Sequence, residues 1–135
     1  PILVAPPTSP QQTGAHIAMA WEASPEAART IAVSIQALVE AGQVTVLAPN
    51  LPQPLPLAPE DLVDRLAWHG VDAKIHVFDA GATELGPAFL DHAAKVGADM
   101  LVKGAYSQSR LRQMILGGRT RHILNHTTIP TLRAK

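Results

Sequence analysis

Apolar residues recur along this chain with two different periods, and the two kinds of segment alternate. Short apolar runs that are typical of buried strands lie at residues 17–21, 44–48, 71–78, 100–103 and 129–132. Helical spacing fills the intervals between them, at residues 25–42, 60–68, 85–96 and 119–125. Strands that alternate with helices favour parallel pairing and right-handed crossovers. The pattern therefore predicts a Rossmann-like α/β fold, an open five-stranded parallel sheet with helices on both faces.

Local sequence signals mark where these elements begin and end. Ser24, Pro25 and Glu26 combine a helix N-cap, a proline at the first helical position and an acid in the first turn. Gly42 suits the end of the same helix. Residues 50–59 contain four prolines, which exclude a regular helix or a central strand. We therefore expect a loop over this stretch.

The composition narrows the class of protein. The 135 residues suit one domain with its own core, and 47% of them are hydrophobic against 16% charged. The chain has no cysteine, which excludes disulfides and thiolate catalysis, so nothing requires an oxidising compartment. No apolar run approaches the roughly 20 residues that a membrane span needs. We therefore expect a cytoplasmic protein with no membrane partner.

Charge is distributed unevenly, although the net charge is zero. Asp99 is the last acidic residue, and seven of the eleven lysines and arginines follow it. A basic region of this kind favours phosphate, and it equally fits a solvated helix face and tail. Nucleic acid fits less well, because Tyr106 is the only aromatic residue in the basic region and stacking platforms are missing. We expect no nucleic-acid partner.

A glycine-rich segment coincides with the basic region. The apolar run at residues 100–103 ends at Gly104, and Gly117 and Gly118 stand immediately before a helical segment. Backbone amides reach an anion where side chains are absent, and a helix N-terminus adds unpaired N–H groups and a partial positive charge. The segment therefore predicts a phosphate-binding loop. The alternative is that these glycines have no ligand and only allow a tight turn before the helix.

Residues 101–120, LVKGAYSQSRLRQMILGGRT, resemble the phosphate loop of the universal stress proteins. The loop of that family reads Gly-x-x-Gly-x9-Gly-Ser/Thr. At these places, two of which match, this chain has Gly104, Ser107, Gly117 and Gly118. The resemblance covers residues 15–135 and includes the segments HIAMAWEAS and PTLRAK. It implies an adenine-nucleotide alpha-hydrolase-like fold, a role in stress response and weak binding of ATP with Mg²⁺.

The same resemblance implies a longer protein with two domains. Residues 104–124, GAYSQSRLRQMILGGRTRHIL, are similar to the form found in tandem members. Residues 1–6, PILVAP, are similar to the strand that closes the first half of such proteins, and the chain lacks a starting methionine. Residues 1–14 would then be the last strand and linker of a preceding domain. Residues 15–135 would form the universal stress protein domain of the C-terminal half.

The nucleotide contacts of the family carry over position by position. Glu22 corresponds to an acid that faces adenine and ribose, Pro49 to an apolar residue against the base, and Lys103 to a frequent Met. Lys103 could meet phosphate or block adenine, and Arg119 could bond a phosphate oxygen. The full set of contacts that the resemblance implies is Ala20, Glu22, Pro49, Lys103, Gly104, Ser107, Gly117, Gly118, Arg119 and Thr120.

Catalytic chemistry finds little support in these residues. An ATPase needs Mg²⁺ ligands and a group that positions water, but Glu22 is the only acidic residue near the expected site. His122 and His126 stand at i, i+4 but lack a third metal ligand. The other histidines form no cluster: His16, His69, His76 and His92. We expect neither enzyme activity nor a metal site. Two functions stay open, a nucleotide-binding sensor and an interaction module without ligand.

The last predicted strand is an edge that invites a partner. In the universal stress proteins this strand commonly pairs antiparallel with its counterpart in a neighbouring domain, and an exposed edge offers unpaired N–H and C=O groups. The resemblance implies pairing of Thr128, Ile129, Thr131 and Leu132 with Ile2, Leu3 and Val4. We expect residues 1–6 to cap this edge within the chain or to exchange between two copies in a homodimer. In a tandem protein the partner would be the N-terminal half.

Overall fold

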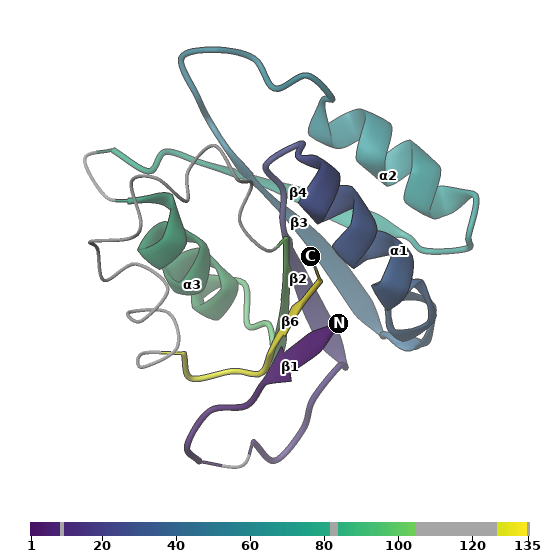
Figure 1. The fold of residues 1–135 in the computed structure, drawn as a ribbon, viewed down its shortest axis with the longest axis vertical. Coiled ribbons are helices and arrows are strands. Elements are labelled where there is room, and N and C mark those ends of the chain that lie inside the picture. Colours follow the sequence, from purple (N-terminus) through teal and green to yellow (C-terminus); the bar gives the residue numbers. More distant parts are fainter. Residues whose placement is uncertain (9, 82–83, 105–126, 135) are drawn as a thin grey trace.

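A computed structural model describes residues 1–8, 10–81, 84–104 and 127–134 of this chain. Figure 1 shows the strands and helices, which are, in chain order, β1 (Ile2–Val4), β2 (His16–Ala20), α1 (Pro25–Glu40), β3 (Gln43–Pro49), α2 (Pro59–Ala67), β4 (Ala73–Phe78), α3 (Leu85–Lys95), β5 (Met100–Lys103) and β6 (Thr131–Arg133). From β2 to β5, strands and helices alternate as the hydrophobic pattern predicts. The helix predicted at residues 119–125 lies outside the described residues.

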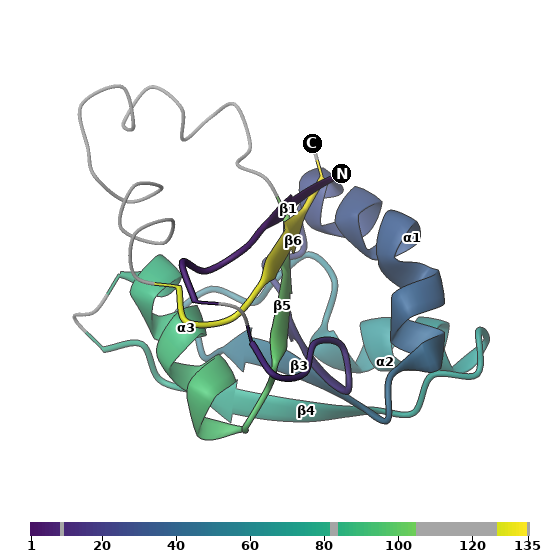
Figure 2. The same cartoon turned by 90° about the horizontal axis from the view of Figure 1, so that it is seen from below.

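The described strands form one six-stranded sheet in the order β1-β6-β5-β2-β3-β4. The neighbours from β6 to β4 pair in parallel. β1 runs antiparallel to β6, with Ile2 opposite Arg133 and Val4 opposite Thr131, so the two ends of the chain lie together (Figure 2). The predicted α/β class with a mostly parallel sheet is confirmed. The origin of residues 1–14 in a preceding domain stays a prediction.

Helices cover both faces of this sheet, with α1 and α2 on one face and α3 on the other (Figure 1). Ile17 and Val46 belong to the core cluster under α1 and α2, and both are 0% exposed. Ala18 and Leu47, the next residue of each strand, belong to the second cluster under α3. Successive side chains of a strand point to opposite faces, so each strand of the centre contributes to both cores.

Local contacts explain the ends of several elements. The predicted N-cap of α1 is confirmed, because the Ala27 amide donates to Ser24 Oγ at 3.1 Å. Residues 50–58 contain no helix or strand, as their prolines predict. β4 begins two residues later than expected, because the Val71 amide donates instead to the Leu66 carbonyl at the end of α2 (3.1 Å). Among the described helices, none has both the length and the hydropathy of a membrane span.

Candidate functional site at the ends of β2 and β5

The carboxyl ends of β2 and β5 lie side by side in the centre of the sheet. Ala20 pairs with Lys103 in the parallel register, and these residues are 5% and 3% exposed. On the other side of β2, Leu47 pairs with Ala20, and β3 runs on for two further residues to Pro49. Strand order therefore reverses at β2, which has β3 on one side and β5 on the other. Open α/β sheets bind ligands beyond the carboxyl ends of strands at such a reversal.

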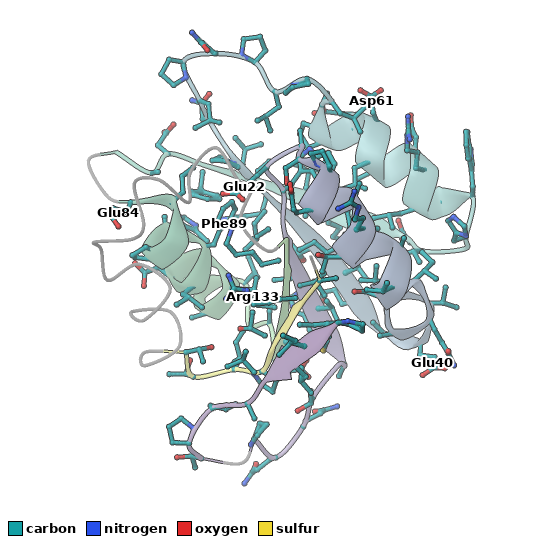
Figure 3. The ribbon with its side chains drawn as sticks, in the orientation of Figure 1. Glu22, Glu40, Asp61, Glu84, Phe89 and Arg133 are labelled. Carbon is teal, nitrogen blue, oxygen red and sulfur yellow. The ribbon has the colours of Figure 1, made fainter. Side chains whose placement is uncertain are left out.

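An ion pair occupies this edge of the sheet. Lys103 Nζ donates to Glu22 Oε2 at 3.0 Å, and the side chain of Glu22 keeps 29% of its surface exposed. The ammonium of Lys103 also lies 5.1 Å from the ring centre of Phe89, a distance typical of a cation–π contact. Glu22 comes from the loop after β2 and Phe89 from α3, so Lys103 of β5 contacts both that loop and the helix layer (Figure 3). A carboxylate and an aromatic face thus hold a buried cation at the predicted site.

The turn between β2 and α1 sets the position of Glu22. Ala23 has φ +47°, the left-handed region that non-glycine residues rarely adopt. This turn separates Glu22, which bonds Lys103, from Ser24, which caps α1. The helix N-terminus therefore begins directly beside the ion pair, where its partial positive charge favours anions.

Gly104 follows Lys103 and lies against the first turn of α1. A Cβ atom on Gly104 would be 2.6 Å from the Ala27 amide nitrogen and 2.9 Å from the Ala27 Cα, closer than real Cβ atoms approach backbone. The glycine is therefore required for the contact between the end of β5 and the start of α1. This contact gives Gly104 a structural role in addition to the anion-binding role that the sequence predicts.

A second carboxylate lies in the first turn of α1. Glu26 Oε2 is buried and has no hydrogen-bond partner among the described residues, while the helix N-terminus stabilises the negative charge. Together with Glu22 it places two acids near the cation of Lys103. Phosphate binding therefore needs further positive charge. The sequence supplies it in the basic residues beyond Gly104, of which Arg133 ends β6 and the others lie outside the described residues.

The described members of the predicted contact set meet at this edge: Ala20, Glu22, Pro49, Lys103 and Gly104. The other members lie outside the described residues: Ser107, Gly117, Gly118, Arg119 and Thr120. The sequence assigned Glu22 to adenine and ribose and left Lys103 either to meet phosphate or to block adenine, and it did not predict that the two residues bond each other. Phe89 was missed altogether, because neither its spacing nor its neighbours indicate that its ring faces Lys103.

Two histidines, one from β4 and one from α3, contact each other away from this site. His76 Nε2 is 2.8 Å from His92 Nδ1, and the ring of His92 stacks on Phe78 with 4.1 Å between ring centres. The prediction that these histidines form no cluster was wrong, because β4 and α3 bring together residues that are distant in sequence. Burial lowers the pKa of His92 from its ordinary value, and the electrostatic influence of nearby Lys95 and His76 lowers it further. In the described part of the chain, no three potential metal ligands converge.

Comparisons with known proteins place this geometry in a family. The family model described as Universal stress protein family matches residues 1–135. A search of curated proteins found no match. Among solved structures, a universal stress protein from Archaeoglobus fulgidus DSM 4304 superposes with a TM-score of 0.71 at 14% identity, over 90% of this chain. This chain spans 44% of the length of that protein.

Two further structures match over nearly their whole length. A universal stress protein in complex with cAMP has a TM-score of 0.69 at 17% identity, covering 89% of this chain and 95% of its own. A universal stress protein from Archaeoglobus fulgidus in complex with dAMP has a TM-score of 0.58 at 21% identity, covering 88% and 96%. At these identities the structures establish the shared fold, and the family model covers the chain from end to end. The chain belongs to the universal stress protein family.

Proposed function

We propose that this chain binds an adenine nucleotide beyond the carboxyl ends of β2 and β5. The observation that carries the proposal is the meeting of Glu22, Lys103 and Gly104 beside the N-terminus of α1. The two neighbours with cAMP and dAMP support it, because both ligands contain adenine, a sugar and one phosphate. The ligand that the family resemblance implies for this chain is ATP with Mg²⁺.

The residues of the described site would contact different parts of the nucleotide. Glu22 retains an exposed carboxylate surface that can accept hydrogen bonds from ribose hydroxyls, while Lys103 holds its other oxygen. Pro49 offers a buried apolar surface toward the base. The first turn of α1 and the basic residues after Gly104 act on the phosphates. Because Lys103 is already bonded to Glu22, we expect the nucleotide to bind weakly and to leave this ion pair intact.

We propose sensing in a cytoplasmic stress response as the role of this site, without catalysis. The described site contains an ion pair and a glycine contact, and it has no pair of nucleophile and base among its described residues. A bound nucleotide would link the loop after β2 to the loop after β5. Through this link, the concentration of nucleotide would change the surface that these two loops present to a partner protein.

Titration calorimetry of the purified, nucleotide-stripped protein with AMP and with Mg²⁺-ATP tests the proposal. We expect saturable binding to one site, weakened about tenfold in Glu22→Ala, because a hydrogen bond to a charged group contributes about 1.5–3 kcal/mol. Glu60→Ala is the matched control, since Glu60 is an exposed acid on α2. Absence of saturable heat up to millimolar nucleotide would overturn nucleotide binding.

The edge of the sheet favours a second function, assembly through β1. Ile2 and Leu3 are 70% and 55% exposed although they lie in a strand, and among the described strands β1 pairs on one side only. An exposed apolar edge strand is a template for further pairing. We propose that β1 mediates a homodimer, or contact with a preceding domain where this chain is part of a tandem protein.

Sedimentation equilibrium measures this assembly directly. We expect a dimer for the chain as given, and a monomer for Leu3→Asp, which places a charge on the exposed apolar strand. Thr8→Asp adds the same charge at an exposed position outside β1 and should leave the dimer intact. A chain that is monomeric at all concentrations would overturn the homodimer, leaving the nucleotide proposal untouched.

A further inference from the structure

A groove runs between α1 and α2, on the face of the sheet away from α3. It has a volume of about 300 Å³. Apolar side chains of α1 and α2 form most of its lining, together with Trp21, Leu57, Arg65 and His69. Figure 1 shows α1 and α2 side by side, with the loop between β3 and α2 arching past their ends. The groove is thus distinct from the predicted nucleotide site, whose ion pair faces α3.

Trp21 forms the floor of the groove and is held there by a hydrogen bond. Trp21 is 2% exposed, and its indole Nε1 donates to the Leu57 carbonyl at 3.1 Å. This bond ties the proline-rich loop of residues 50–58 to the floor, so the loop closes one end of the groove. On the wall formed by α1, Ala28 and Ala32 are one turn apart and too small to fill the space toward α2. The hollow therefore follows from the residues that surround it.

The lining of the groove carries positive charge, from Arg65, and no negative charge. Apart from apolar side chains, the groove is lined by Arg65 and His69, which lie near the C-terminal end of α2, and no carboxylate is among the lining residues. Arg65 makes no ion pair with any residue that the structure describes. A guanidinium at the rim of an apolar groove is complementary to a ligand with an apolar body and a carboxylate head.

We propose that this groove binds a small carboxylic acid with an extended aliphatic body, a medium-chain fatty acid. The aliphatic body lies between α1 and α2 over Trp21, and the carboxylate bonds Arg65 at the rim. The volume is adequate, because an apolar cavity of about 150 Å³ holds benzene and ligand pockets begin at roughly 300 Å³. The proposal is independent of nucleotide binding.

Trp21 provides the readout for a binding test. The chain has two tryptophans, and Trp68 is 84% exposed, so Trp68→Phe leaves Trp21 as the sole indole. Decanoate is titrated into this variant below its micellar concentration, with decanol as the uncharged probe. We expect a saturable change in Trp21 emission with decanoate. Adding Arg65→Gln should weaken decanoate binding about fivefold, as expected for a partly exposed charge pair of about 1 kcal/mol, and leave decanol binding unchanged.

A second variant tests the location of binding. Ala32→Phe fills the groove from α1 and should abolish the response, while Ala94→Phe, at an exposed position of α3, should preserve it. Circular dichroism checks that each variant folds. A response that does not saturate, that survives Ala32→Phe in a folded protein or that AMP displaces would overturn the groove as the binding site. Equal loss of decanoate and decanol in the Arg65→Gln variant would overturn the role of the carboxylate.

Discussion

Lys103 donates a hydrogen bond of 3.0 Å to Glu22, and this contact joins the end of β5 to the loop after β2. Lys103 is 3% exposed and Glu22 29%, so the cation has far less access to water than the carboxylate. We predict that Glu22→Ala lowers the free energy of unfolding by about 1–3 kcal/mol, because it withdraws an acceptor from a buried charge. Urea denaturation measures the change.

Lys103→Met gives the complementary result. It replaces the buried cation with an apolar side chain of similar length, and the half-exposed Glu22 can turn to water, so we expect a smaller loss of stability than for Glu22→Ala. Replacing an exposed lysine, Lys74→Met, sets the scale for a surface change, within about 0.5 kcal/mol. A larger loss for Lys103→Met than for Glu22→Ala would show that the cation stabilises the fold mainly through other contacts.

Gly104 is predicted to tolerate no side chain. Gly104→Ala would place its Cβ 2.6 Å from the Ala27 amide nitrogen, so the first turn of α1 has to shift. We expect a loss of about 1–3 kcal/mol in thermal or chemical denaturation, typical of overpacking against backbone. Gly42→Ala is the control, since its Cβ would meet only the Ala15 carbonyl oxygen, at 3.4 Å. Equal stability of the two variants would contradict the tight contact.

Asp99 is predicted to stabilise the start of β2. Its carboxylate accepts hydrogen bonds from the amides of Gly14 (2.8 Å), Ala15 (3.1 Å) and His16 (3.1 Å). Asp99→Ala leaves these amides without their acceptor, and we expect unfolding to become easier by about 2–3 kcal/mol. Asp72→Ala, at an exposed acid before β4, should change stability by less than about 0.5 kcal/mol. A similar effect of both substitutions would contradict this account.

The His76–His92 pair predicts a loss of stability in mild acid. The pKa of His92 lies below its ordinary value of 6.5 in the folded protein, so the unfolded state binds more protons between the two values. The free energy of unfolding should therefore fall as the pH drops below about 6.5 and level off below the folded pKa. Protonation of both rings would also remove the acceptor from their 2.8 Å contact.

Chemical denaturation between pH 7.5 and pH 5 measures this dependence. His92→Gln should give a shallower slope than the unchanged protein, because it removes the group whose pKa is lowered. The charged neighbours act in opposite directions, since Lys95 lowers the pKa of His92 and Asp91 raises it. Lys95→Gln should accordingly reduce the slope by part of the same amount. Identical slopes for all three proteins would contradict a role of His92.

The hydrophobic pattern of the chain predicted the helices and strands well, because the spacing of buried residues within each element can be read from neighbouring positions in the sequence. It also placed Glu22 and Lys103 at one edge, since parallel strands bring their carboxyl ends together. It did not predict their ion pair or the ring of Phe89 below Lys103, because side-chain directions depend on register and on how α3 packs. The groove was likewise unpredicted, since Ala28 and Ala32 look like ordinary helix residues until α2 faces them.

The proposed function depends on nucleotide binding at the ends of β2 and β5. Its most direct test is the change of backbone amide NMR shifts during titration of the ¹⁵N-labelled protein with AMP. We predict saturable shifts at Ala20, Glu22, Lys103 and Gly104, with none at Leu62 and Leu66 beside the α1–α2 groove. Spectra that stay unchanged up to millimolar AMP, or that change only at the groove, would contradict the claim.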